Sequence, residues 1–173
     1  KNFFDNRDLK QITLENNKCA VGGSVTVTEL AGSSIIQNIF PDLEKCIKLI
    51  SSTPVRNMAT MAGNLVNASP IGDMTIFFLA LNAELELSNG NSNRTIYLKD
   101  FYKGYKLLNK NDDEFIEKMI FTKPPKDSVF NFEKVSKRTW LDIASVNSAC
   151  LMQMGKDGTI NDIHLSAGGI APF

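Results

Sequence analysis

The sequence predicts an α+β fold in which helices come early and antiparallel strands follow. Helical patterns lie mainly between residues 28 and 83, and strand-like runs dominate after that point. Two hairpin signals, Asn89-Gly90 and Asp157-Gly158, separate strand-like runs in the second half of the chain. A block of helices followed by strands favours α+β over the regular alternation of a doubly wound α/β fold.

The N-terminal part is expected to begin with short elements. Apolar residues recur at helical spacing over Leu43–Ser51, which predicts a helix that Pro54 ends. Four short elements are expected before it, namely strands over Leu9–Leu14 and Cys19–Val21 and helical turns over Val25–Leu30 and Ile35–Phe40.

The segment 55–73 has neither a helical nor a strand period, and small and polar residues crowd it. We therefore expect a loop, with Asp73 as the N-cap of an apolar helix over Met74–Ala83. Small residues and exposed backbone N–H groups would let such a loop wrap a pyrophosphate or a ribose. A polar loop with a helix cap remains the competing interpretation, since neither a GxGxxG nor a Walker pattern is present.

Strands are expected to make up most of the remaining chain. The hairpin at Asn89-Gly90 joins the first two of them, and Pro124-Pro125 closes the third. The last three, which surround Asp157-Gly158, are expected to form a separate sheet. The expected strands cover Glu84–Leu87, Arg94–Leu98, Phe115–Phe121, Phe130–Lys134, Ser145–Met154 and Thr159–Ala167.

The composition excludes several classes of protein. Nineteen basic and nineteen acidic residues give no net charge, so the basic surface of a nucleic-acid-binding protein is not expected. No apolar run has the length of a membrane span. The three cysteines are dispersed and the one histidine, His164, has no Ser or Cys nearby, so neither a metal centre nor a catalytic pair is predicted. Unpaired cysteines indicate a reducing, cytoplasmic compartment.

The stretch Ala59–Asp73 resembles the second FAD-binding motif of the flavin domain in xanthine dehydrogenase and carbon monoxide dehydrogenase-type molybdenum hydroxylases. It departs from that motif at Ala62, where the family usually has the first of two glycines. Leu9–Leu30 and Met74–Leu87 look like the family's flanking segments, and 134–172 looks like the start of its C-terminal domain. The resemblance runs in order along nearly the whole chain.

The resemblance implies a set of FAD contacts. Lys134 corresponds to a lysine near the isoalloxazine, although taken alone it would be an exposed strand lysine. Asn67 stands where the family often has Thr. The implied contacts are the side chains of Thr60, Asn64, Asn67, Ser69, Asp73, Ile116 and Lys134 and the backbone of Met61, Ala62 and Gly63.

The resemblance also implies a fold and a domain division. The fold would be the two-subdomain FAD-binding fold of the vanillyl-alcohol oxidase and xanthine dehydrogenase type, without its first subdomain. Residues 1–125 would be a partial FAD-binding domain, and 126–173 would begin a mainly β C-terminal domain. The family's first FAD loop has no counterpart here, which indicates a chain truncated at both ends that holds FAD weakly or not at all.

The implied function is that of an oxidoreductase component that transfers electrons through FAD. It would accept them from a 2Fe-2S iron–sulfur subunit, work beside a molybdopterin subunit, and pass them to NAD⁺ or another acceptor. No residue need act as a general acid or base. The alternative is a non-catalytic interaction module that kept the fold and lost FAD. A free-standing flavin reductase is a weaker option, because nothing resembles a nicotinamide site.

Overall fold

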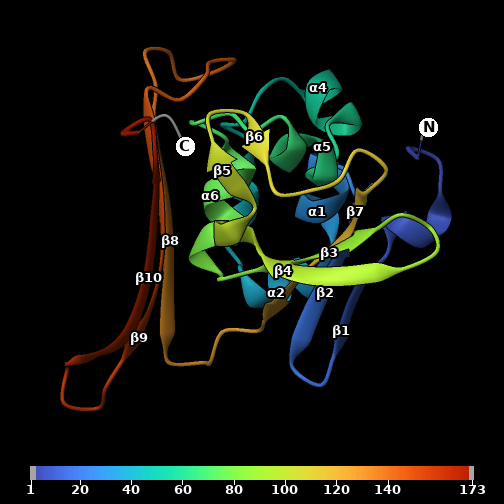
Figure 1. The fold of residues 1–173 in the computed structure, drawn as a ribbon. Helices are drawn as coiled ribbons and strands as arrows, with labels where there is room; N and C mark the ends of the chain where they lie inside the picture. The colour runs from blue at the N-terminus through green and yellow to red at the C-terminus, as the bar shows by residue number, and fades with distance from the viewer. Residues whose placement is uncertain (1–2, 172–173) are drawn as a thin grey trace.

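The computed structural model describes residues 3–171. Two antiparallel sheets of five and three strands lie on either side of a group of short helices, and a small two-stranded sheet packs beside them (Figure 1). The five-stranded sheet has the order β1-β2-β7-β3-β4, and the three-stranded sheet has the order β10-β9-β8. None of the helices in the described range has the length and apolar character needed to cross a bilayer.

The elements are short, and the helices all fall in the first half of the chain. The helices are α1 (Val27–Gly32), α2 (Ser34–Ile39), α3 (Leu43–Ile47), α4 (Thr53–Met58), α5 (Met61–Val66) and α6 (Asp73–Ala80), with 3-10 turns η1 (Arg7–Lys10) and η2 (Leu98–Asp100). The strands are β1 (Ile12–Glu15), β2 (Lys18–Gly22), β3 (Glu84–Ser88), β4 (Asn93–Tyr97), β5 (Tyr102–Gly104), β6 (Leu107–Leu108), β7 (Phe115–Thr122), β8 (Ser128–Val135), β9 (Val146–Met154) and β10 (Ile160–Gly168).

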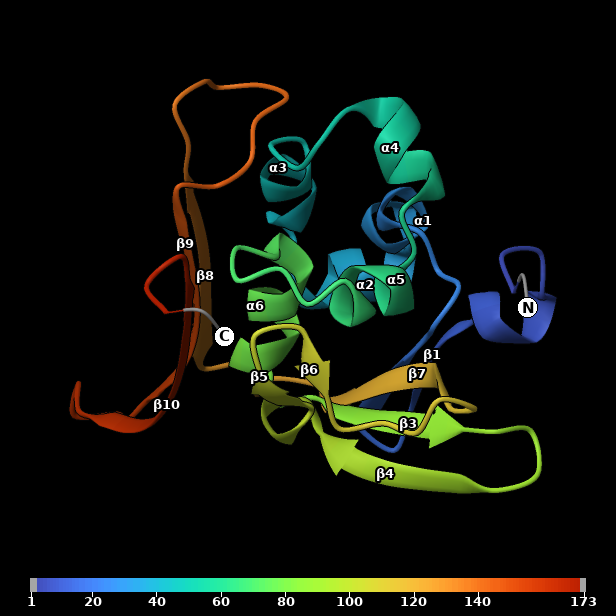
Figure 2. The ribbon, with the colours of Figure 1, turned by 45° about the horizontal axis from the view of Figure 1, so that its top comes forward.

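The five-stranded sheet has one apolar and one polar face. In β3, Leu85 and Leu87 are fully buried, whereas the alternating Glu84 and Glu86 are only partly buried. This period of two places the leucines under the helices, which lie on one face of the sheet (Figure 2). The β1–β2 turn is made by Asn16 and Asn17, whose φ angles of 48° and 68° are both in the left-handed region that Asn tolerates.

Helix α6 lies at the centre of the fold because nearly all of its side chains are apolar. Its residues contact both β9 and β10, and it stands between the three-stranded sheet and the other helices (Figure 2). Phe77 is fully buried, and its ring lies 5.3 Å from that of Phe40, 5.1 Å from Phe78 and 5.5 Å from Phe130 in β8. A helix that is apolar all round must be buried on all sides, so α6 joins the two sheets into one core.

Most expected elements are present, with some changed ends. Both hairpins and the separate last sheet are confirmed. The first strand starts at Ile12 rather than Leu9, because residues 7–10 form the η1 turn. The helix expected over Leu43–Ser51 ends at Ile47, and Ser51 has a left-handed φ of 51°. Residues 172–173, at the end of the last resembling segment, lie outside the described range.

The expectation of a continuous loop over 55–73 is wrong. The segment holds most of α4 and all of α5, each six residues long, which is too short for a period to show in the sequence. Pro54 lies in the first turn of α4 rather than ending the previous helix, a position where its missing N–H group has no cost. Asp73 does not cap α6 either, because Gly72 is the N-cap and no side chain caps that end.

We expect Phe77→Ala to lower the free energy of unfolding by about 3–5 kcal/mol, because it leaves a cavity where both sheets meet α6. Urea denaturation followed by circular dichroism measures the change. The control is Tyr105→Ala, whose side chain is 63% exposed and should change stability by less than about 0.5 kcal/mol. Equal losses in the two variants would contradict the central role of α6.

Candidate cofactor-binding site

Helix α5 begins after Thr60, whose side chain caps the helix and whose backbone contacts Thr26. The Thr60 hydroxyl oxygen accepts a hydrogen bond of 3.1 Å from the Gly63 N–H, and the Thr60 backbone bridges to Thr26. A Cβ added at Gly63 would lie 2.8 Å from that hydroxyl oxygen. Glycine at this position therefore lets the Thr60 cap form.

The start of α5 lies close against the end of β2. A Cβ on Gly23 would lie 2.3 Å from the Ile116 carbonyl oxygen and 3.2 Å from the Ala62 methyl group. The Ala62 N–H donates to the Gly23 carbonyl at 3.0 Å, and the Met61 N–H donates to Val25 at 2.8 Å. The backbone N–H groups of Met61, Ala62 and Gly63 thus each have a partner within the protein.

A groove of about 530 Å³ opens beside this junction. Four of the expected contacts, Thr60, Ala62, Gly63 and Ile116, line it. Phenyl rings supply much of the apolar wall, and Phe3 stacks on Phe115 with 4.6 Å between the ring centroids. The other lining residues are Phe4, Leu9, Gly23, Ser24, Met58, Val66, Lys110 and Glu114. A cavity of this size with an apolar wall and a few polar groups is typical of sites for flat organic ligands.

A second group of expected residues is buried between α6 and the three-stranded sheet. The Lys134 ammonium lies 2.8 Å from one oxygen of Asp73 and donates to the Leu49 carbonyl at 3.1 Å. The side chains are 3% and 9% exposed. Asn147 donates to the other Asp73 oxygen at 2.7 Å and to the Ile71 carbonyl at 3.1 Å. The two charges are therefore paired and hydrogen-bonded, as buried charges must be.

Two amide oxygens, one on α5 and one on β9, have no hydrogen-bond partner within residues 3–171, and Asn64 does not line the groove. The Oδ1 atoms of Asn64 and Asn147 are both buried without one. An unpaired buried acceptor costs about 1–3 kcal/mol, so each such atom needs a donor, which an ordered water or a ligand would supply. Asn64 is an expected site residue, whereas Asn147 was not singled out from the sequence.

The remaining expected residues do not join either group. Met61 is fully buried in the core. Asn67 is exposed at the C-terminal end of α5. Ser69 lines a separate small cavity with Thr75 and Tyr102, where burial raises the pKa of the Tyr102 phenol to about 12. Within residues 3–171, no group of three or more His, Cys, Asp or Glu side chains is arranged to hold a metal ion.

Sequence reasoning missed Asn147 and Gly23 as parts of this region. Asn147 comes from β9, seventy-four residues after Asp73, and no local pattern reports such a contact. Residues of a strand point alternately to its two faces, and the position of Asn147 on the inner face of β9 is the one sequence signal that could have indicated burial. Gly23 was part of a resembling segment, but the need for a glycine there arises from the approach of α5 and β7.

Glu114 at the rim of the groove is held by a strong ion pair. The Arg94 guanidinium donates to its two carboxylate oxygens at 2.6 and 2.8 Å. This hydrogen bonding, with that of the Asn111 N–H, lowers the pKa of Glu114 to about 2. Because the pKa in the folded state lies below the unfolded value of about 4.3, the pair stabilises the fold above that value. The contribution is lost as the pH falls toward about 2.

We expect Glu114→Gln to make the stability of the protein depend less on pH in the acid range. The wild-type protein should lose stability between about pH 5 and pH 2 more steeply than the variant, because only the wild type must protonate this carboxylate. Thermal unfolding across that range measures the difference. An unchanged slope would show that the ion pair does not act on folding.

We expect Lys134→Met to lower the free energy of unfolding by about 3–5 kcal/mol, because it leaves the Asp73 charge buried without its cation. The double variant with Asp73→Asn should lose less than the sum of the two single losses. Lys45→Met is the control, because its pair with Asp42 is 81% exposed at both side chains and should have little effect. Strict additivity would contradict the coupling.

Comparisons with known proteins agree on one family. A family model described as the FAD binding domain in molybdopterin dehydrogenase matches residues 6–124. The xanthine dehydrogenase of Emericella nidulans is 28% identical over 98% of this chain and 13% of its own length. The xanthine dehydrogenase FAD-binding subunit of Escherichia coli O157:H7 is 28% identical over 95% of this chain and 57% of its own length.

Solved structures have the same fold. A carbon monoxide dehydrogenase from Hydrogenophaga pseudoflava, which lacks the Mo-pyranopterin moiety of its cofactor, superposes with a TM-score of 0.88 at 25% identity. The match covers 95% of this chain and 57% of that one. The present chain thus spans about half the length of the separate flavin subunits that it matches. Because the family model covers more than half of the chain, the protein belongs to the family of FAD binding domains in molybdopterin dehydrogenases.

Proposed function

We propose that this chain holds part of an FAD molecule in the groove at the start of α5. The proposal rests mainly on the convergence of Thr60, Gly63 and Ile116 on one groove of about 530 Å³. Its apolar walls would pack against a flat ring or a ribose, and the Thr60 hydroxyl could donate one hydrogen bond. Small residues at Ala62 and Gly63 let a ligand approach the backbone closely.

A further argument comes from Asn64, which lies on α5 next to the groove residue Gly63 without lining the groove itself. Its buried Oδ1 acceptor lacks a donor, and the hydroxyl and ring N–H groups of FAD are donors of the required kind. The engaged N–H groups of residues 61–63 argue that side chains and the α5 edge, rather than a nest of free amides, would contact the nucleotide. The resemblance implies that Lys134 lies near the ring system, but neither Asp73 nor Lys134 lines the groove.

When bound, FAD would supply a ring system that takes up electrons and releases them to a second carrier. The chain itself would position the nucleotide, exclude water with Phe115 and Ile116, and hold the charges of Asp73 and Lys134 fixed. The wider proposal is an oxidoreductase component that receives electrons from an iron–sulfur subunit beside a molybdopterin subunit. NAD⁺ or another acceptor would take up the electrons, and the cytoplasm is the proposed location.

The finer division of the chain is part of the same proposal. The five-stranded sheet ends at Thr122 and the next sheet begins at Ser128, which supports a boundary near residue 125. Residues 1–125 would form the second subdomain of a two-subdomain FAD-binding fold. Residues 126–173 would begin a C-terminal domain that packs on α6.

We expect Asn64→Ala, in the full-length protein, to weaken FAD binding about ten- to hundredfold, the effect of losing one strong hydrogen bond. Folding without FAD should be nearly unchanged, because the variant removes an unsatisfied polar atom. Gly63→Val should weaken FAD more, since its Cβ would strike the Thr60 hydroxyl 2.8 Å away. Flavin fluorescence titration and thermal unfolding measure the two properties.

The matched control is Asn91→Ala, an exposed asparagine in the β3–β4 hairpin. It should leave both FAD affinity and stability unchanged. If Asn64→Ala behaves like this control toward FAD, the α5 junction is scaffold and the proposed site is wrong. A colourless full-length protein that takes up no added FAD would instead favour a non-catalytic module.

A further inference from the structure

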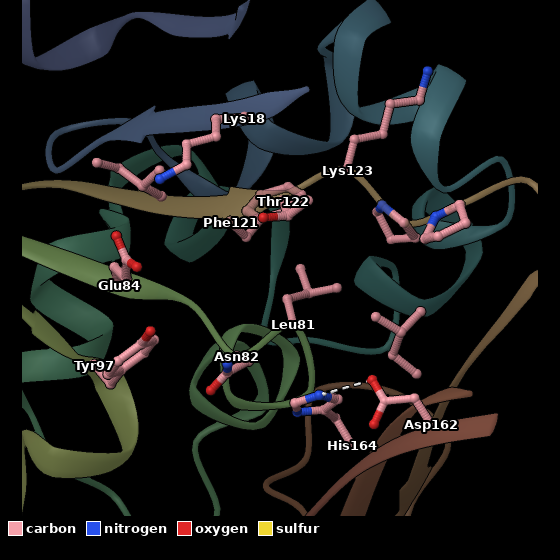
Figure 3. Close-up of a pocket in the computed structure, with 14 residues that line it drawn as sticks. Lys18, Leu81, Asn82, Glu84, Tyr97, Phe121, Thr122, Lys123, Asp162 and His164 are labelled. Carbon is pink, nitrogen blue, oxygen red and sulfur yellow. Dashed lines mark ion pairs between the residues drawn. The ribbon is translucent and has the colours of Figure 1, made fainter. Parts of the chain in front are cut away.

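A second hollow lies at the other end of the five-stranded sheet, away from the groove. It has a volume of about 250 Å³ and is formed where β2, β7 and β3 meet the three-stranded sheet (Figure 3). Ile116 lines the groove and Thr122 lines this hollow. Along β7 the two residues are separated by roughly 20 Å, at about 3.3 Å per residue. We name this hollow the junction cleft.

The junction cleft has an apolar floor and a polar rim. Leu81 and Phe121 form the floor at 5% and 2% exposure, and Ile120 and Leu151 extend it. The polar rim comes from separate elements of the fold and consists of Lys18, Asn82, Glu84, Tyr97, Thr122, Lys123, Asp162 and His164.

Most of the polar side chains of this rim have no hydrogen-bond or ion-pair partner among residues 3–171. Among the rim side chains, Asp162 and His164 lie together, with 3.3 Å between the carboxylate oxygen and the His164 Nε2 atom. Within residues 3–171, the ammonium of Lys18 and the carboxylate of Glu84 have neither a hydrogen bond nor an ion pair. The neighbouring pair on the same face of the sheet, Glu86 and Lys118, does join, at 3.2 Å. Unused donors and acceptors around an apolar floor are the arrangement that a ligand site requires.

The charges around the cleft are balanced. Lys18 and Lys123 oppose Glu84 and Asp162, and the remaining titratable side chains of the lining are His164 and Tyr97. In Figure 3 the Lys18 side chain extends toward Glu84, whereas Lys123 points away from the other rim residues. A simple anion would meet the carboxylates and a simple cation would meet the lysines. A ligand that carries both charges is complementary to both.

We propose that the junction cleft binds a small zwitterion with an apolar side chain, of the α-amino acid class. The Lys18 ammonium would receive its carboxylate, and the Glu84 carboxylate would receive its ammonium group. The floor of Leu81 and Phe121 would take the apolar side chain, and Asn82 is the uncharged amide of the lining. The cleft shares no residue with the groove, so this site does not depend on FAD.

Three probes test the proposal by calorimetry on the full-length protein. L-leucine carries both charges and an apolar side chain, 4-methylpentanoate lacks its ammonium group, and 3-methylbutylamine lacks its carboxylate. We expect L-leucine to bind in the millimolar range, and each singly charged analogue to bind at least about tenfold more weakly, since each loses a charged hydrogen bond.

Lys18→Met and Glu84→Gln locate the site. Each should weaken L-leucine about tenfold or more, with FAD content unchanged. Lys103→Met is the matched control, because Lys103 is exposed and does not line the cleft, and it should bind L-leucine normally. Unchanged unfolding temperatures would show that the variants are folded.

The other outcomes overturn the proposal. If 4-methylpentanoate binds as well as L-leucine, the cleft is an anion site. If no probe binds, its side chains are simply solvated at the junction of the two sheets. If Lys18→Met and Lys103→Met behave alike, L-leucine binds elsewhere.

Discussion

The buried ion pair between Asp73 and Lys134 joins the two halves of this protein. Asp73 begins α6, and Lys134 lies near the end of β8, so the pair connects the helical layer to the three-stranded sheet. Both side chains are largely buried, and each charge has its partner only when both elements are in place. Removing one partner would leave the other charge buried and unpaired, so the pair couples the first residue of α6 to β8.

The fold also requires neighbouring elements to approach each other closely at two places, and a glycine makes this possible at each of them. Gly23 lets β2 and α5 meet at β7, beside the groove. Gly168 lies against Asn147, where an added Cβ would come within 2.2 Å of the amide oxygen. A larger residue at Gly23 would push apart the elements beside the groove, and one at Gly168 would push β10 away from Asn147 and Pro70. The same packing that closes the core thus also shapes the surface available to a ligand.

Residues of the resembling motif have two kinds of role in the structure. Thr60 caps α5 and Met61 fills the core, so part of the motif serves the fold itself. Asn64 has a buried oxygen that the fold leaves without a donor. A protein that needed only the scaffold would gain stability by replacing that side chain with an apolar one. A ligand or an ordered water would supply the missing donor.

Local chemistry in the sequence was enough to predict both hairpins and most of the strands, but not β5 and β6 of the two-stranded sheet. Alternating Glu and Leu in β3, and Asn-Gly after it, act over a few residues, so they are visible without any tertiary contact. The same is true of the motif 59–73, whose order of residue types indicated the family. The short helices α4 and α5 were missed because six residues are too few to show a period, and their caps act only at their ends.

Tertiary structure alone decided where the polar groups of the motif are used. Asp73 was expected to cap its own helix, yet its carboxylate is bound by Lys134 and Asn147, sixty-one and seventy-four residues later in the chain. The partners come from strands whose approach depends on the whole core. A hydrogen bond between distant residues leaves no periodic trace in a sequence, because its geometry exists only after the chain has folded.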